Sequence, residues 1–245
     1  MKAKELFQAG RLDEAVRALG AELRDDPADT QRRTFLFELL CFAGDFQRAE
    51  KQLDVLGETD PTAAMAVLLY RGVLRAENAR QGFFSEKQFL GRGATPETGT
   101  AGVCNGKPFT TFIDADPRIG ARLEVLAGGR YLWIPFQHIS SVEIEAPQRL
   151  RDLLWAPAVV RTTPAFKERD LGAVFVPVLS PGSSTYPDDA VRLGRATAWL
   201  EPENGNVIPM GQKMFLVDEE ELPLLELRHL DFSHPEVSVE TNASS

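Results

Sequence analysis

The stretch Gly10-Arg11-Leu12-Asp13-Glu14-Ala15 returns 34 residues later in the chain as Gly44-Asp45-Phe46-Gln47-Arg48-Ala49. The same shift places Asp26-Pro27 on Asp60-Pro61, and five of the 18 positions from 10 to 27 are identical to their counterparts. Average amino-acid composition gives about one such identity by chance. The N-terminal part of the chain is therefore an internal repeat with a period of 34 residues.

A 34-residue period is typical of the tetratricopeptide repeat, in which each unit is a pair of helices that stacks on the next unit. Apolar residues recur at helical spacing between positions 12 and 23, and Pro27 ends that helix because its ring clashes with the preceding turn. Asp29 or Thr30 can cap the next helix, and Gly44 supplies the turn between paired helices. We therefore expect residues 1–90 to form a tetratricopeptide-like α-α superhelix.

The third unit of this array is incomplete. Asp60-Pro61 opens a third helical segment, and we expect its inner side to carry Met65, Leu68, Leu69 and Val73. Asn78 stands where the next turn glycine belongs, so the array contains about two and a half repeats. So short an array needs its exposed end covered by another part of the chain.

The second half of the chain reads as a different domain. Residues 91–108 are rich in glycine and threonine and predict a linker or long loop, and residues 109–235 contain short β-rich runs. Two of these runs flank Gly128-Gly129 and predict a hairpin. Further strands are expected at 142–145, 173–179, 213–217 and 224–227, with an acidic turn at 218–221 and a disordered tail at 236–245.

The predicted fold class is a multi-domain α and β protein. An N-terminal α-α superhelix is followed by an α+β domain with a largely antiparallel sheet or a partly closed barrel. The 245 residues are enough for two ordinary domains, each with a core of its own.

Charge and composition exclude several classes of partner. The formal net charge is -9, and no stretch forms the basic stripe that nucleic acid or an anionic membrane requires. No uncharged apolar run approaches the roughly 20 residues that span a bilayer, and no signal peptide is visible at the N-terminus. The two cysteines, Cys41 and Cys104, are too few for a disulfide framework, so we expect a cytoplasmic protein.

Catalytic motifs fail on specific points. The segment 102–107 resembles a phosphate-binding loop but lacks one spacer residue, and Pro108 occupies the position of the metal-binding hydroxyl. The three histidines have no cysteine pair or acidic residue at zinc-ligand spacing. Asp114 and Asp116 could hold a divalent cation, but before Pro117 they read better as a strand end that caps a short helix. We predict no cofactor, no metal and no enzymatic activity.

Ordered blocks in the second half resemble the ImpE family, also called SciE or TagJ. The first block runs from Asp114-Ala115-Asp116 to Gly129-Arg130-Tyr131-Leu132-Trp133-Ile134-Pro135-Phe136. The later blocks are 150–158 with Arg151, Asp152 and Trp155, 181–199 with Arg192, Arg195 and Trp199, and 211–227. These blocks are far more specific than the repeat, and they extend the likeness over nearly the whole chain.

The resemblance implies a cytoplasmic, non-enzymatic accessory protein of a bacterial type VI secretion system. Members of the family bind an N-terminal helical region of the small subunit of the contractile sheath, and they are thereby placed to connect the sheath to the ATPase that disassembles it. A modulating role is implied, since the family does not accompany every such system. A general tetratricopeptide scaffold or chaperone for another complex remains an alternative, and an enzyme that uses Asp114 and Asp116 is a weaker one.

Stacked helix pairs leave a groove in which an amphipathic helix can lay its apolar face. The repeat register sends one set of side chains toward that groove: Gln31, Thr34, Glu38, Cys41, Phe42, Met65, Leu68 and Arg75. The alternative is that these groups pack against the C-terminal domain, which would fill the groove.

Four charged residues within the family blocks, Arg151, Asp152, Arg192 and Arg195, are expected to form structural ion pairs or to cap loops rather than to bind a ligand. The tryptophans are expected to anchor the core: Trp133, Trp155 and Trp199.

Overall fold

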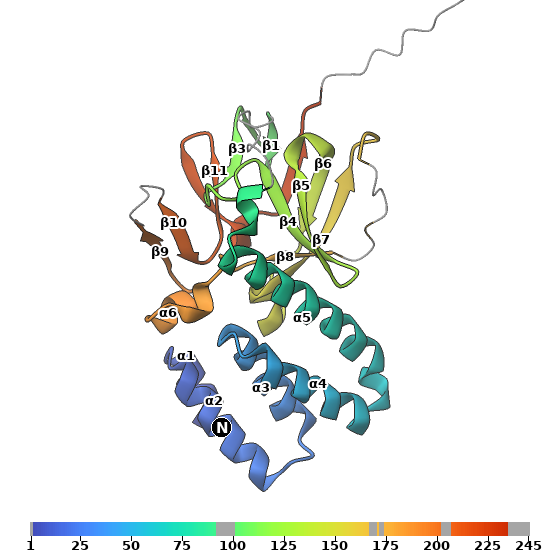
Figure 1. The fold of residues 1–245 in the computed structure, drawn as a ribbon, viewed down its shortest axis with the longest axis vertical. Helices are drawn as coiled ribbons and strands as arrows, with labels where there is room; N and C mark the ends of the chain where they lie inside the picture. The colour runs from blue at the N-terminus through green and yellow to red at the C-terminus, as the bar shows by residue number, and fades with distance from the viewer. Residues whose placement is uncertain (1, 92–100, 167–170, 172–173, 202–206, 235–245) are drawn as a thin grey trace, which may run out of the picture.

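The computed structural model places an array of helices against one end of a β-sheet domain (Figure 1). It describes residues 2–91, 101–166, 171, 174–201 and 207–234. The long helices are α1 (Lys2–Gln8), α2 (Leu12–Asp25), α3 (Thr30–Phe42), α4 (Phe46–Thr59) and α5 (Ala64–Ser85). Among the described residues, no helix combines the length and the apolar character needed to cross a membrane.

The repeat forms the helix pairs that its sequence predicts. Gly10 and Gly44 stand between the paired helices with φ of 74° and 72°, a backbone conformation that glycine adopts without strain. Asp29 caps α3 by accepting a hydrogen bond from the Arg32 backbone N–H, with an N–O distance of 2.8 Å. Asp45 caps α4 in the same way.

Helix α5 departs from the repeat. No turn interrupts it at Asn78, and it runs on for 22 residues from the helical array onto the sheet (Figure 1). Its buried face carries Val67, Tyr70, Val73 and Leu74, while Met65, Leu68 and Leu69 are exposed. The expected inner side is therefore confirmed for Val73 and wrong for Met65, Leu68 and Leu69. A repeat-based register cannot anticipate a helix whose buried face is set by its contact with the sheet.

The remaining elements form the second domain. Its strands are β1 (Gly102–Cys104), β2 (Lys107–Phe109), β3 (Phe112–Asp114), β4 (Arg122–Ala127), β5 (Arg130–Pro135), β6 (Ile139–Ile144), β7 (Trp155–Thr162), β8 (Val174–Pro177), β9 (Thr197–Leu200), β10 (Ile208–Gly211), β11 (Met214–Val217), β12 (Glu220–Pro223) and β13 (His229–Phe232). One short helix, α6 (Asp189–Arg192), precedes β9.

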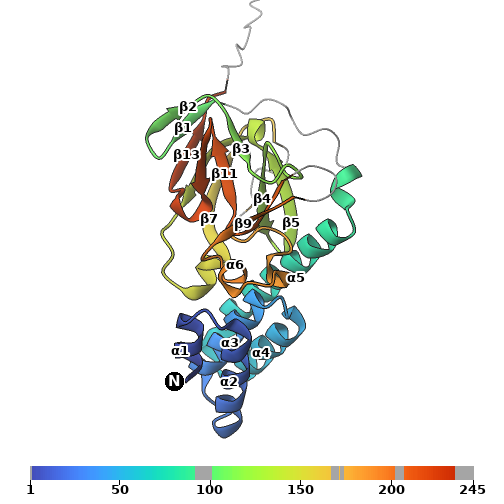
Figure 2. The same cartoon turned by 90° about the vertical axis from the view of Figure 1, so that its left-hand side faces the viewer.

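Eight of these strands form one sheet in the order β2-β1-β13-β6-β7-β8-β4-β5, and every pairing is antiparallel. A three-stranded sheet (β12-β11-β3) and the hairpin of β9 and β10 complete the domain. Figure 2 shows this domain stacked on the helices along the long axis of the molecule. The predicted fold class, a helical superhelix followed by a largely antiparallel domain, is confirmed.

Local predictions met mixed outcomes. The hairpin around Gly128-Gly129 is present as β4 and β5, and the buried strand predicted at 173–179 is β8, although residue 173 lies outside the described residues. The segment predicted as a linker contains the strands β1 and β2, so the sheet domain begins earlier than expected. The tail at 236–245 lies outside the described residues.

The late strand predicted at 224–227 is wrong. Residues Leu224–Glu226 form a 3-10 turn, and the strand that pairs with β11 is the acidic segment β12 just before it. Its backbone pairs with β11 and Leu222 packs partly against the core, while Glu220 and Glu221 stay exposed. Leu224 and Leu227 are buried from the turn instead, which explains their apolar character.

The core is continuous from the helices into the sheet domain. Buried residues of all five long helices pack in one cluster with side chains from the second domain: Leu126, Leu154, Trp155, Phe175, Leu179 and Leu193. A second cluster fills the interior of the sheet domain around Phe112 and Phe136. The helices and the sheet domain are thus joined by a common hydrophobic core.

Candidate protein-binding surface

The inner side of the helical array is covered by the sheet domain. The Trp155 ring lies 6.5 Å from the Phe37 ring and 6.4 Å from the Tyr70 ring, measured between centroids. The Tyr70 ring also lies 6.1 Å from Phe175 of β8. These contacts bury the inner faces of α3 and α5, so this side of the array is closed.

Three of the predicted groove residues, Glu38, Cys41 and Phe42, are consequently inaccessible. Phe42 is 1% exposed, and Glu38 is 7% exposed and forms an ion pair of 3.3 Å with Arg151 of the sheet domain. Burial raises the pKa of the Glu38 carboxyl, although the Arg151 charge opposes this shift. The neighbouring Cys41 thiol is also buried. Glu38 and Phe42 therefore contact the sheet domain, which is the alternative that the sequence left open.

Two further groove predictions lie at the start of α3. The Thr34 hydroxyl donates a hydrogen bond of 2.8 Å to the Thr30 carbonyl of the preceding turn, and the side chain is half-buried. Gln31 is exposed in the first turn of the helix. Neither residue lines the groove beside α5 that is described below.

The charged residues of the later family blocks connect the two domains. Arg192 contacts Asp13 of α2 at 3.0 Å and Asp189 of its own helix at 2.7 Å. Asp189 in turn accepts a hydrogen bond from the Leu12 backbone N–H at the start of α2. Arg195 donates to two carbonyls at the end of α1 and stacks over the Phe7 ring. These are the contacts of ion pairs and helix caps.

Arg151 contacts the helices α3 and α5, and Asp152 holds the loop that carries Arg151. The Arg151 guanidinium lies over the Tyr70 ring in addition to its pairing with Glu38. The Asp152 carboxylate accepts hydrogen bonds from the backbone N–H groups of Gln148 and Arg149, which fixes the loop before β7.

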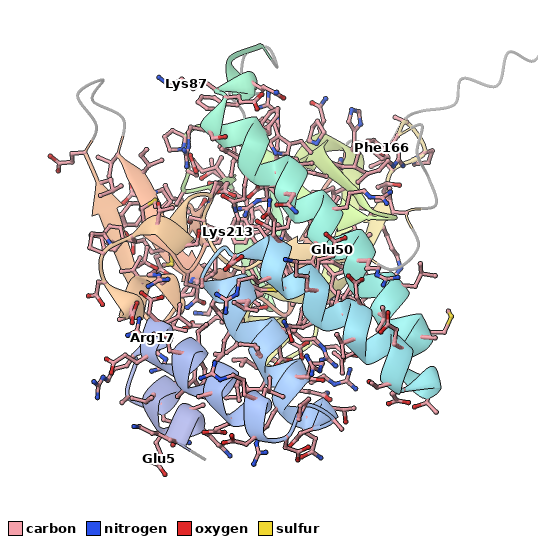
Figure 3. All side chains as sticks on the ribbon, turned by 60° about the horizontal axis from the view of Figure 1, so that its bottom comes forward. Glu5, Arg17, Glu50, Lys87, Phe166 and Lys213 are labelled. Carbon is pink, nitrogen blue, oxygen red and sulfur yellow. The ribbon has the colours of Figure 1, made fainter. Side chains whose placement is uncertain are left out.

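A buried network of charges lies where α5 crosses the sheet; Figure 3 marks Lys213, one of its members. Arg80 of α5 donates to Glu124 of β4 at 2.8 and 3.1 Å and to Glu77 at 3.0 Å. Lys213 contacts Glu124 at 2.6 Å and Asp114 at 2.5 Å. Every one of these five side chains is at most 4% exposed. Sequence reasoning missed Arg80, Glu124 and Lys213, because most partners in this network lie 44 to 99 residues apart in the chain and no local pattern links them.

Burial and charge act in opposite directions on the two carboxyls beside Lys213. Burial raises the pKa of Asp114 to about 7, against the influence of the lysine. Burial would also raise the pKa of Glu124, but the charges of Arg80 and Lys213 outweigh it and hold that pKa far below its ordinary value.

The two predicted carboxylates do not form a cation site. Asp116 pairs with Arg118 at 2.6 Å, and Asp114 pairs with Lys213 and accepts a hydrogen bond from the Asp116 backbone N–H. The segment 117–119 is a single turn rather than the expected short helix, and the Asp116 carboxylate caps it by accepting a hydrogen bond from the Arg118 backbone N–H. Within the described ranges, no group of three or more potential metal ligands is found.

The three tryptophans have different environments. Trp133 packs against Phe83 of α5 with ring centroids 5.0 Å apart, on the strand that Pro135 ends. Trp155 lies in the interface, and its indole N–H donates to Glu77. Trp199 is 40% exposed, so its prediction as a core anchor is wrong. Among the described strands, β9 pairs only with β10, and the outer face of this small hairpin therefore stays in solvent.

The accessible apolar surface lies on the outside of α5. Met65, Leu68 and Leu69 are 77, 66 and 42% exposed, and Arg75 follows on the same helix face. Three of the residues predicted to contact a partner, Met65, Leu68 and Arg75, thus share one exposed face.

A groove of about 360 Å³ runs beside this face, between α5 and the β4–β5 turn. Its walls are Leu68, Leu69, Arg71, Gly72, Val73, Arg75, Leu126, Gly128, Gly129 and Phe175. The helix and the turn approach closely where both lack side chains, since a Cβ atom on Gly72 would lie 3.6 Å from the Gly129 Cα. We call the exposed α5 face together with this groove the α5 surface.

Residues 106–231 match the ImpE protein family, and residues 6–70 match a tetratricopeptide repeat family. A Pseudomonas aeruginosa protein, the type VI secretion system accessory component TagJ, is 34% identical over 264 aligned positions that cover 95% of this chain and 91% of that protein. The chain belongs to the ImpE family. A crystal structure of a Vibrio parahaemolyticus protein, at 22% identity, shows the same fold with a TM-score of 0.85 over 96% of this chain and 99% of its own.

The region that matches the ImpE family supplies one side of every interdomain ion pair described above. Arg151 and Arg192 lie within it, and their partners Glu38 and Asp13 lie in the helices before it. The ImpE-family region and the tetratricopeptide-like helices are therefore built as one unit, with the α5 surface left on the outside.

Proposed function

We propose that this ImpE-family chain is a non-enzymatic, cytoplasmic adaptor of a type VI secretion system. It binds an N-terminal helix of the small contractile-sheath subunit and modulates the engagement of that subunit by the disassembly ATPase. The relative named as an accessory component of such a system supports the accessory role. The match of residues 6–70 to a tetratricopeptide repeat supports a role in holding another protein.

The observation that carries this proposal is the α5 surface. Large apolar side chains exposed together on one helix face mark sites of protein contact. Their exposure to water is unfavourable, and a partner that buries them removes this cost. An apolar groove beside a helix suits an amphipathic partner helix, whose apolar side chains enter it at helical spacing. We therefore place the sheath helix on the outside of α5.

The buried charges support an architectural role rather than a catalytic one. Arg80, Glu124, Lys213 and Asp114 pair with one another at the domain junction and lie away from solvent. A catalytic acid or base must reach its substrate, and these groups are enclosed by the core. We assign them to holding α5 on the sheet.

The test is a pull-down of the small sheath subunit by the full chain. We expect the intact subunit to be retained by the full chain, and a subunit without its first helix not to be retained. Leu68→Asp should weaken binding at least about tenfold, since it places a charge where the partner buries an apolar group. Leu200→Asp, at another exposed leucine, is the matched control and should bind normally. Equal retention of both forms of the subunit would refute the proposal.

A general tetratricopeptide scaffold for another bacterial complex is the second candidate, favoured by the repeat match alone. Genes that encode a contractile sheath and its disassembly ATPase should lie beside the gene for the adaptor. Their absence from the neighbourhood would favour the scaffold.

A further inference from the structure

We propose that the occupant of the α5 surface is an amphipathic helix with a carboxylate about seven residues from its main apolar contact, and that Arg75 receives this carboxylate. This inference rests on the proposed function and adds to it the chemistry of the partner. It follows from the order of apolar and charged groups along α5.

Apolar and charged groups are segregated along the exposed face. Met65, Leu68 and Leu69 occupy its N-terminal part, and Arg75 stands seven residues after Leu68. At a rise of about 1.5 Å per residue, seven residues separate the two positions by about 10 Å along the helix axis. A second helix that lies along α5, in either direction, repeats this spacing between its own apolar residue and its own charged residue.

The middle of the α5 surface is open to an incoming side chain. Gly72 separates the apolar end from Arg75, and Gly128-Gly129 forms the opposite wall. The three glycines put no side chain into the groove, and Val73, Leu126 and Phe175 make part of its lining apolar. The partner can thus bury an apolar side chain between the two ends of the face.

The charge of the groove selects the sign of the partner. Both charged residues in its walls are arginines, Arg71 and Arg75. Arg71 pairs with Asp54 of α4 at 2.6 Å, whereas Arg75 forms no hydrogen bond or ion pair with another described residue. An exposed guanidinium beside an apolar groove attracts a carboxylate and repels an ammonium group. A helix with an acidic residue at the matching position fits both features.

Synthetic helices of about 16 residues test this inference on the full chain by fluorescence anisotropy. One peptide carries a leucine stripe and a single glutamate seven residues from the central leucine, and two sister peptides carry glutamine or lysine at that position. We expect the glutamate peptide to bind about three- to tenfold more tightly than the lysine peptide, as for an exposed charge pair that changes sign. The glutamine peptide should lie between them.

Charge reversal on the protein gives the decisive comparison. Arg75→Glu should reverse the preference so that the lysine peptide binds more tightly, while Arg24→Glu, at an exposed arginine of α2, should leave it unchanged. Leu68→Asp should weaken all three peptides. Equal affinities of the glutamate and lysine peptides, a preference that Arg75→Glu does not alter, or no binding of any peptide would each overturn the inference.

The outcome is separable from that of the proposed function. If the sheath subunit binds through its first helix but the peptides show no charge preference, the proposed function stands and this inference fails. If the peptides behave as expected and the sheath subunit does not bind, the chemistry of the surface stands and the partner is a different helix.

Discussion

Lys213 is 1% exposed, and its ammonium group lies within 2.6 Å of carboxylate oxygens from both Asp114 and Glu124. Burial opposes its charge, but the two carboxylates more than compensate and raise the pKa of the lysine. Arg80 satisfies Glu124 from the other side. The groups depend on one another, because removal of either cation leaves carboxylates in the core without enough positive charge.

Lys213→Met should therefore lower the free energy of unfolding by about 3 to 5 kcal/mol, since Asp114 and Glu124 would face each other without their shared cation. Urea denaturation followed by circular dichroism measures this loss. Lys51→Met, at an exposed position of α4, is the matched control and should change stability by less than about 0.5 kcal/mol. A loss below about 1 kcal/mol for Lys213→Met would contradict the interdependence of the network.

Asp114 should give the protein a characteristic pH dependence. The pKa of Asp114 is about 7 in the folded protein and 3.8 in the unfolded chain. Between these pH values the folded protein therefore binds more protons than the unfolded chain. Its contribution to stability is fully present below pH 3.8 and is lost as the pH rises toward 7. Glu124 acts oppositely, since its lowered pKa stabilises the fold above pH 4.5 and that stability is lost on acidification.

Asp114→Asn removes this titration while it preserves the size of the side chain. We expect the variant to lose the decline in unfolding free energy between about pH 4.5 and pH 7, a decline of at most about 1.4 kcal/mol per pH unit from one group. Urea titrations at several pH values provide the measurement. Asp54→Asn, at an exposed carboxyl of α4, should retain the slope of the unaltered protein. An unchanged slope in Asp114→Asn would assign the pH dependence to other groups.

At the scale of elements, the repeat turns have a second use. Gly44 ends the turn between α3 and α4 with a positive φ, and its Cα faces Ser184 so closely that an added Cβ would lie 2.6 Å from the serine Oγ. Gly10 faces Arg195 in the equivalent turn. Gly44, which permits the pairing of α3 and α4, thus also permits this pair to lie close against the sheet domain.

Gly44→Ala should destabilise the protein by about 1 to 2 kcal/mol, because alanine is strained at positive φ and its methyl group must displace Ser184. Gly20→Ala should instead stabilise it by about 0.5 to 1 kcal/mol, since Gly20 lies within α2 with open space around it. Thermal unfolding of the two variants checks this opposition. A stabilising Gly44→Ala would show that the turn is not constrained by the sheet domain.

The elements that sequence reasoning predicted are those fixed by local rules. The turn at Gly44, the cap at Asp29 and the hairpin at Gly128-Gly129 each follow from the conformations of a few adjacent residues. The buried face of α5 was misjudged because it is set by Phe175 and Trp155, which lie roughly 100 residues further along the chain. Strand β12 was missed for a related reason, since its pairing with β11 rests on backbone groups that side-chain patterns do not report.

The residues predicted for the binding surface also fall into two groups, those that local periodicity predicts correctly and those whose exposure depends on the rest of the fold. Met65, Leu68 and Arg75 share one exposed face because helical periodicity is local, and the repeat register carried them together. Glu38 and Phe42 were placed in the same groove by that register, but the sheet domain covers them. Which wall of a helical array stays open depends on what packs against it, and no repeat pattern contains that information.

At the scale of the whole molecule, the sheet domain replaces the missing half repeat. Two and a half repeats expose an apolar face that a longer array would cover with its next helix pair. Here Trp155, Leu154 and Phe175 cover it from the sheet, and the buried residues of both parts form one cluster. A shared core of this kind predicts that the helices and the sheet unfold together.

Trp155→Ala tests whether the helices and the sheet domain unfold together, and Trp199→Ala is its control. Trp155 is buried between α3, α5 and the sheet, so its loss should cost about 3 to 5 kcal/mol and should lower the hydrogen-exchange protection of α3 and β7 by the same factor. Trp199 is 40% exposed on β9, and its replacement should cost less than about 1 kcal/mol without altering α3. Loss of protection in β7 alone would mean that the helices have a core of their own. An equal loss of protection in α3 and β7 would mean that the helices and the sheet domain form one rigid body. A force that a partner exerts on the α5 surface would then reach the sheet domain without a hinge.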